Sequence, residues 1–160
     1  MRPAVSVIER FDNAAYTLGR LGVDSYSLMA MRNSILGLPK TTAPEPVVAL
    51  HGDFTPRNVL CRPGPVVTVL DTDLSLAGHP AYDLGWFLAA LEFLDRWQLY
   101  TTGRAYDRNA LDRVRSAFLS GYTSEGPAVP STHTLAAHTA ARLVQRWAQY
   151  ASHLQAEQPR

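Results

Sequence analysis

The sequence predicts a mostly helical α+β fold, a single domain with one small β-hairpin in its middle. Its 160 residues suffice for about one domain, and its 46% hydrophobic and 18% charged residues are typical of a globular protein with a core. Stretches with helical spacing of apolar residues flank a short segment with strand-like apolar runs. We therefore divide the domain into helices and a loop over 1–46, a central segment over 47–80, and a helical region over 81–160.

The N-terminal region predicts two helices and a loop. Apolar side chains recur every three or four residues over 4–20, which is the spacing of one buried helical stripe. Asp24 or Ser25 can cap a second helix, which ends before the glycine and proline at 37–39. Residues 37–46 contain three prolines and predict a loop.

The central segment predicts a strand followed by a β-hairpin. Val47–Leu50 is a short apolar run with the length of a buried strand. Two further apolar runs, Asn58–Cys61 and Val66–Leu70, are separated by an Arg-Pro-Gly-Pro turn at 62–65, so we expect them to pair. Residues 72–80 predict a loop.

Three helices are predicted after this segment. The first begins at Ala81, Asp107 caps the second, and Ser131 opens the third. In the third we expect an apolar stripe to face the core: Ala136, Ala140, Leu143, Trp147, Tyr150 and Leu154. The opposite side holds polar residues: His138, Arg142, Arg146 and Gln149.

The bulk composition excludes several classes of protein. A net charge of +1 gives no electrostatic reason to expect a nucleic-acid partner. Cys61 is the single cysteine, so an intrachain disulfide is impossible and a reducing compartment is favoured. The longest apolar run, Leu84–Leu91, is too short to span a membrane. Glu9 and Asp12 interrupt the N-terminal segment, which is not typical of a signal peptide. We expect a cytoplasmic protein without a membrane partner.

Three polar residues of the central segment have a spacing that suits phosphoryl transfer. Asp53 follows the predicted strand on a loop, where a carboxylate can orient an acceptor hydroxyl and take its proton. Asn58 lies five residues later, and its amide oxygen can be a neutral ligand of Mg²⁺. Asp71 stands at the far end of the hairpin, which brings it back beside Asn58. These oxygen ligands beside Asp53 predict a site for Mg²⁺ and a nucleotide.

The same segment resembles the aminoglycoside phosphotransferase and choline kinase family. The resemblance rests on His51-Gly52-Asp53 with Asn58, on Val-Leu-Asp71, and on Gly78-His-Pro-Ala-Tyr-Asp83-Leu. It covers 47–88 in detail and the flanking helices in kind only. It implies a protein-kinase-like fold, of which this chain is the C-terminal lobe, with a small hairpin that carries the catalytic and metal-binding loops.

The resemblance also implies a role for each residue. Asp53 would be the catalytic base, and His51 would brace the catalytic loop. Asn58 and Asp71 would be the metal ligands, and Asp83 would support the loop from the following helix. The implied cofactors are Mg²⁺ and ATP (or GTP). The implied reaction transfers the γ-phosphate to a hydroxyl of a small-molecule alcohol, such as an antibiotic or a choline-like compound.

The sequence departs from this family in several places. Thr55 stands where the family often has His, and Thr72 follows Asp71 where an aromatic residue is usual. The family's N-lobe carries a lysine on a strand and a loop over the phosphates, whereas the single lysine here, Lys40, lies in a proline-rich loop. We therefore expect the N-lobe to be absent. A separate N-lobe chain or a second copy of this chain would then be the partner.

Some assignments stay open. Asp73 either assists the metal or faces solvent, and Arg57 either contacts phosphate or substrate or lies exposed in its loop. The chain could instead be a non-catalytic remnant, or half of a split kinase that acts as a binding module. A third possibility is a metal-dependent hydrolase, whose ligands would be His51, Asp53, Asp71, Asp73 and His79.

Overall fold

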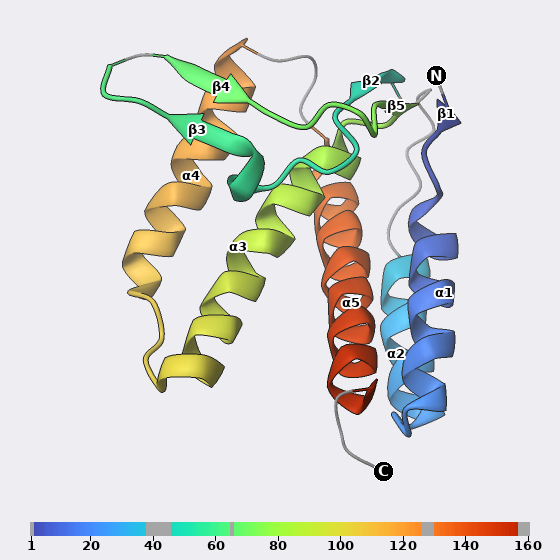
Figure 1. Ribbon diagram of the computed structural model, residues 1–160. Coiled ribbons are helices and arrows are strands. Elements are labelled where there is room, and N and C mark those ends of the chain that lie inside the picture. Colours follow the sequence, from blue (N-terminus) through green and yellow to red (C-terminus); the bar gives the residue numbers. More distant parts are fainter. Residues whose placement is uncertain (1, 38–45, 65, 126–129, 157–160) are drawn as a thin grey trace.

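The computed structural model describes residues 2–37, 46–64, 66–125 and 130–156. Its helices are α1 (Val7–Arg20), α2 (Ser25–Leu36), α3 (Ala81–Thr102), α4 (Arg108–Glu125), α5 (Thr132–Ala156) and the short 3-10 helix η1 (Pro56–Asn58). Its strands are β1 (Arg2–Pro3), β2 (Val48–Leu50), β3 (Val59–Cys61), β4 (Val67–Val69) and β5 (Leu76–Gly78). The strands gather at one end of the helices, and α5 stands between α3 and α1 (Figure 1).

The core lies where α5 packs against α1 and α2. Buried side chains from these helices form two clusters: Phe11, Ile35, Ala137 and Ala141 in one, and Ala14, Leu18, Leu28 and Ala148 in the other. The contributions of α5 are all alanines, which allow the larger side chains of α1 and α2 to approach its backbone closely.

The first two helices begin at side-chain caps. The Ser6 hydroxyl accepts a hydrogen bond from the backbone N–H of Glu9 at 3.1 Å, and the Asp24 carboxylate accepts one from Ser27 at 2.8 Å. Each cap satisfies a backbone donor that the first turn of a helix leaves unpaired. Asp24 is therefore the cap of α2, one of the two residues that the sequence offered.

The strands form two small sheets. β5 is the central strand of a three-stranded sheet, with β1 parallel on one side and β2 antiparallel on the other. β3 and β4 pair antiparallel as the predicted hairpin, with Leu60 opposite Thr68. The segment between β2 and β3 joins the two sheets and lies over the start of α3 (Figure 1).

The predicted helices and hairpin agree with the structure, which is mostly helical with small sheets. The expectation of a loop throughout 72–80 is wrong in part, because β5 lies within it. Three residues have too little pattern to predict a strand, and β5 forms because β1 and β2 offer it partners on both sides. Most of the predicted loop at 37–46 lies outside the described residues.

The prediction of which side chains of α5 are buried is wrong in part. Trp147, expected in the core, is 43% exposed, whereas Arg142, expected on the polar side, is only 4% exposed. The helix packs between two others, so a single apolar stripe does not describe its buried surface. At its contact with α3, a Cβ atom on Gly85 would lie 2.8 Å from the Cβ of His138, so the two helices approach closely there.

None of the helices in the described part of the chain combines the length and the apolar character that crossing a membrane requires.

Candidate active site

The candidate site is built on the loop between β2 and η1, which begins at His51. Gly52 has a φ of +88°, a backbone conformation that favours glycine. A Cβ atom at Gly52 would lie 2.2 Å from the carbonyl oxygen of Leu74, so the loop passes directly against that residue. This close approach requires a residue without a side chain. It also fixes the backbone position of the next residue, Asp53.

Asp83 holds the backbone of this loop from the first turn of α3. Its Oδ2 accepts a hydrogen bond from the backbone N–H of His51 at 2.6 Å, and its Oδ1 accepts one from Gly52 at 3.1 Å. Burial raises the pKa of Asp83 above its usual value, and the two N–H groups act in the opposite direction. The carboxylate therefore ties the loop to the helix.

The His51 side chain links the loop to the end of the hairpin. Its Nε2 lies 2.7 Å from the carbonyl oxygen of Leu70, and its Nδ1 accepts a hydrogen bond from the backbone N–H of Asp53 at 3.3 Å. A carbonyl oxygen can only accept a hydrogen bond, so Nε2 carries the proton and donates a hydrogen bond to the carbonyl oxygen of Leu70. One imidazole thus connects the backbone of Asp53 with the residue that precedes Asp71.

Asn58 orients Asp53 from the end of η1. Its Nδ2 donates a hydrogen bond to the backbone carbonyl of Asp53 at 2.9 Å and lies 3.4 Å from the carboxylate Oδ2 of the same residue. Because the amide nitrogen is engaged with Asp53, the amide oxygen of Asn58 is the atom left for a further contact. The Asp53 side chain is 20% exposed, so its carboxylate is mostly enclosed yet accessible.

The hairpin returns the chain to the side of Asn58. The backbone N–H of Leu70 donates to the carbonyl oxygen of Asn58 at 2.9 Å, which extends the pairing of β3 with β4 by one residue. Asp71 follows directly, with an exposed side chain and a φ of +62°, a region that residues other than glycine rarely adopt.

Two of the open candidates lie at the edge of this group. Arg57 Nη2 is 4.0 Å from Asp53 Oδ2, and the arginine side chain is 69% exposed. Asp73 is exposed to solvent. Arg57 therefore lies near Asp53 without being held in the loop, and Asp73 faces solvent.

His79 is directed elsewhere. Its Nδ1 accepts a hydrogen bond from the backbone N–H of Ala81 at 3.1 Å, and its ring stacks on His138 with 6.1 Å between centroids. Among the residues that the structure describes, no three His, Cys, Asp or Glu side chains gather where they could hold a metal ion. The geometry therefore gives no support to the five-ligand site that a metal-dependent hydrolase would need.

An apolar cavity of about 700 Å³ opens beside the loop. Its lining includes His51, Phe54, Asp83, Leu84, Phe118 and Tyr122. Phe54 stacks on Phe87 at 5.5 Å between centroids, and Phe87 stacks on Phe118 at 4.0 Å, so aromatic rings join the loop, α3 and α4. Our sequence reasoning missed this aromatic cluster, although Phe54 directly follows Asp53 and was the available signal.

Comparison with family models adds the deciding observation. The model of the phosphotransferase enzyme family matches residues 13–129, well over half of the chain. The chain belongs to the phosphotransferase enzyme family. The match contains the loop, the hairpin and α3, and it confirms the family resemblance found in the sequence. Helix α5 of this phosphotransferase lies outside the matched range.

No curated protein and no solved structure matches this phosphotransferase. The family match and the geometry of the loop therefore carry the functional argument.

Proposed function

We propose that this phosphotransferase transfers the γ-phosphate of ATP (or GTP) to a hydroxyl of a small-molecule alcohol, with the help of Mg²⁺. The observation that carries the proposal is the enclosed carboxylate of Asp53. The amide nitrogen of Asn58 donates to Asp53, and the imidazole of His51 accepts a hydrogen bond from the backbone N–H of Asp53. Phosphoryl transfer depends mainly on positioning and on charge stabilisation, and this loop is built to position one carboxylate.

Asp53 is the catalytic base in this proposal. A base must stand within hydrogen-bond distance of the hydroxyl whose proton it takes. The proton moves to the Asp53 carboxylate as the alcohol oxygen bonds to the γ-phosphorus, and the bond from that phosphorus to the leaving diphosphate oxygen breaks. Asp83 contributes indirectly, because its carboxylate holds the two backbone N–H groups that precede Asp53.

Asn58 and Asp71 are the residues that would hold Mg²⁺. Mg²⁺ prefers oxygen ligands, and the two residues offer an amide oxygen and a carboxylate on backbone segments that the hairpin pairs. The engagement of the Asn58 amide nitrogen with Asp53 fits this role, because it leaves the oxygen available. When bound, the ion would neutralise part of the phosphate charge. Asp73 is a further candidate on the same exposed segment.

The apolar cavity beside the loop is the proposed site of the acceptor alcohol. It borders His51, the first residue of the catalytic loop, and Asp83, which holds that loop from α3, and its walls include the ring of Phe118. An acceptor with an apolar body would match this lining, and its hydroxyl would reach out of the cavity to Asp53, which lies in the chain between the lining residues His51 and Phe54. Arg57, whose exposed side chain lies 4.0 Å from Asp53, would contact a phosphate or the acceptor in this proposal.

We further propose that these residues form a kinase-like C-lobe that works together with an N-lobe. The described residues contain no lysine that could hold the nucleotide phosphates, since Lys40 is the single lysine and lies outside them. The hairpin exposes apolar side chains where a second lobe would cover it: Leu60 is 44%, Val67 58% and Val69 43% exposed. The same observations favour the alternative of a binding module that does not catalyse by itself.

The test is an Asp53→Asn variant, studied in the intact enzyme with Mg-ATP and a panel of alcohols. Turnover is expected to fall by about 10²–10⁴-fold, the usual contribution of a general base, while calorimetry finds nucleotide binding largely unchanged. The matched control is Asp112→Asn, which removes an exposed carboxylate from α4.

Near-normal turnover in the Asp53→Asn variant would show that Asp53 is not the base. Failure of the unmodified chain to bind Mg-ATP, alone or with an N-lobe partner, would favour the binding module.

A further inference from the structure

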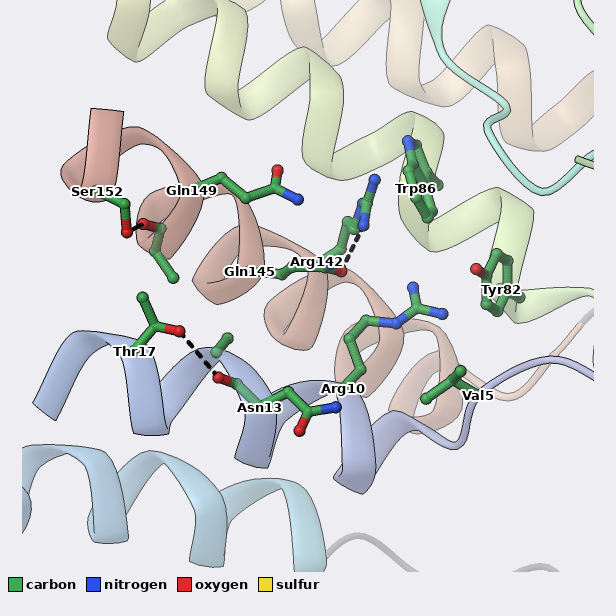
Figure 2. A pocket seen from close by; sticks show the side chains of 12 residues that line it. Val5, Arg10, Asn13, Thr17, Tyr82, Trp86, Arg142, Gln145, Gln149 and Ser152 are labelled. Carbon is green, nitrogen blue, oxygen red and sulfur yellow. Dashed lines mark hydrogen bonds between the residues drawn. The ribbon is translucent and has the colours of Figure 1, made fainter. Parts of the chain in front are cut away.

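A second cavity, of about 530 Å³, opens along the junction of α1, α3 and α5. Figure 2 shows Arg10 on α1 and Arg142 on α5 extending toward the rings of Tyr82 and Trp86 on α3. We call this space the arginine cavity. Uncharged polar residues border it further along the two helices: Asn13, Thr17, Gln145, Gln149 and Ser152. None of these residues belongs to the proposed catalytic group.

The two arginines are buried as deeply as the apolar core. Arg10 is 6% exposed and Arg142 is 4% exposed. Within the described part of the chain, neither guanidinium has a carboxylate within the 4.0 Å of an ion pair. Arg142 donates a hydrogen bond through Nη1 to Gln145, whereas its Nε has no hydrogen-bond partner among the described residues. Buried arginines are almost always paired, so this arrangement is an exception.

Aromatic rings supply part of the missing stabilisation. Arg10 Cζ lies 4.0 Å from the centroid of the Tyr82 ring, and the guanidinium of Arg142 lies over the ring of Trp86. Contacts of this kind stabilise a cation through the face of the guanidinium, and they supply no hydrogen-bond acceptor for Arg142 Nε.

The cavity also concentrates positive charge. Burial, and next the charge of Arg10, lower the pKa of Arg142 well below its usual value, while Tyr82 and Asp53 act in the opposite direction. Two like charges that share a buried space repel each other, and an anion between them would remove both the repulsion and the unmet hydrogen-bond demand.

We propose that the arginine cavity binds the carboxylate or phosphate group of a small organic anion, with Arg10 and Arg142 donating to its oxygens. Both groups present oxygens at the spacing that a guanidinium recognises. A cation would be repelled, and a purely apolar ligand would leave Arg142 Nε unpaired. Gln149 and Asn13, both exposed, border the same cavity and can contact the remainder of the ligand. Its lining shares no residue with the cavity proposed for the acceptor, and Arg142 lies within reach of the charge of Asp53.

The test is a titration of the full chain with sodium phosphate and, separately, with sodium benzoate, at an ionic strength held constant with sodium chloride. Binding is measured by calorimetry and by the NMR signals of the arginine Nε–Hε groups. Arg142→Met and Arg10→Met each remove one guanidinium and keep much of the side-chain volume. Arg20→Gln, which removes an exposed charge from the end of α1, is the matched control.

We expect the unmodified chain and Arg20→Gln to bind at least one of the two anions with a shift of the Arg142 Nε–Hε signal. Each methionine variant should bind it at least about tenfold more weakly, because a charged hydrogen-bond donor is lost. Binding of phosphate alone identifies a phosphate ligand, and binding of benzoate alone identifies a carboxylate.

Thermal unfolding separates binding from packing. Removal of an unpaired buried charge should leave the Tm of Arg142→Met unchanged or higher without anion, and the anion-dependent rise in Tm should disappear. A lower Tm with the anion effect retained would show that the arginines only pack, and it would overturn the proposal. So would the absence of saturable binding, or phosphate binding that shifts the amides of Gly52 and Asn58 but no arginine signal.

Discussion

The loop that carries Asp53 and the arginine cavity lie on neighbouring sides of α3, with a half-buried carboxylate, Asp83, on the first side and two buried arginines on the second. On one side, the carboxylate of Asp83 accepts two backbone N–H groups. On the other side, Arg142 Nε has no partner in the described part of the chain. The carboxylate of Asp83, which holds the loop, has its hydrogen-bond partners within the protein. The guanidinium of Arg142 lacks such a partner at Nε, and a ligand in the cavity can supply it, which is the basis of the anion proposal.

Replacement of Asp83 should produce the largest change in stability. Asp83→Ala leaves two backbone N–H groups without their acceptor, so we expect the free energy of unfolding to fall by about 2–4 kcal/mol. Chemical denaturation measures this change, and hydrogen exchange of the His51 and Gly52 amides should accelerate. Asp112→Ala, an exposed carboxylate on α4, should change stability by less than about 0.5 kcal/mol. Equal effects of the two variants would show that Asp83 does not hold the loop.

A smaller effect is expected at Gly52. In Gly52→Ala, the new Cβ would meet the carbonyl oxygen of Leu74 at 2.2 Å in a backbone with φ of +88°. We expect a loss of about 2 kcal/mol, measured by denaturation. Gly64→Ala is the matched control, because its φ is +104° and no atom lies within 4 Å of the new Cβ. The difference in stability loss between the two variants measures the cost of the contact with Leu74. Equal losses would mean that the loop can move away from Leu74.

The pH dependence of stability tests the cavity side of α3. Burial, and next the charges of Arg10 and His79, lower the pKa of His138 from its usual 6.5 to about 4. The unfolded chain therefore takes up this proton at a higher pH than the folded chain does. As the pH falls from 6.5 to 4, the free energy of unfolding should decrease by up to about 3 kcal/mol through this group, and the contribution is constant above that window.

His138→Gln should flatten this part of the stability profile, which denaturation at a series of pH values would reveal. His153→Gln, an exposed histidine near the end of α5, should leave the profile unchanged. A profile that is the same for His138→Gln and for the unmodified chain would mean that the pKa of His138 is not lowered in the folded protein.

Local sequence patterns predicted much of the fold. Helical spacing located α1 to α5, and the cap at Asp24 and the turn at 62–65 set the limits of α2 and of the hairpin. These features depend on residues close together in the chain, so a pattern of a few residues is sufficient. The short strand β5 was missed because its pairing partners, β1 and β2, lie far from it in the sequence.

The candidate site divides in the same way. The types and spacing of Asp53, Asn58 and Asp71 pointed to phosphoryl transfer from the sequence, and family membership supports that chemistry in its general form. The family resemblance implied that His51 and Asp83 hold the loop. The atoms through which they do so came from the structure, because these contacts span 19 to 32 residues of chain.

The sequence by itself determined the helices, the hairpin and the family of this protein, since periodicity, caps and motifs are local. Tertiary structure alone decided that Arg142 is buried, and that it shares a cavity with Arg10. A charged residue in a helix is predicted to face solvent, and here the packing of three helices around Arg142 buries it. The arrangement of α1, α3 and α5 therefore created the arginine cavity, which no sequence pattern indicated.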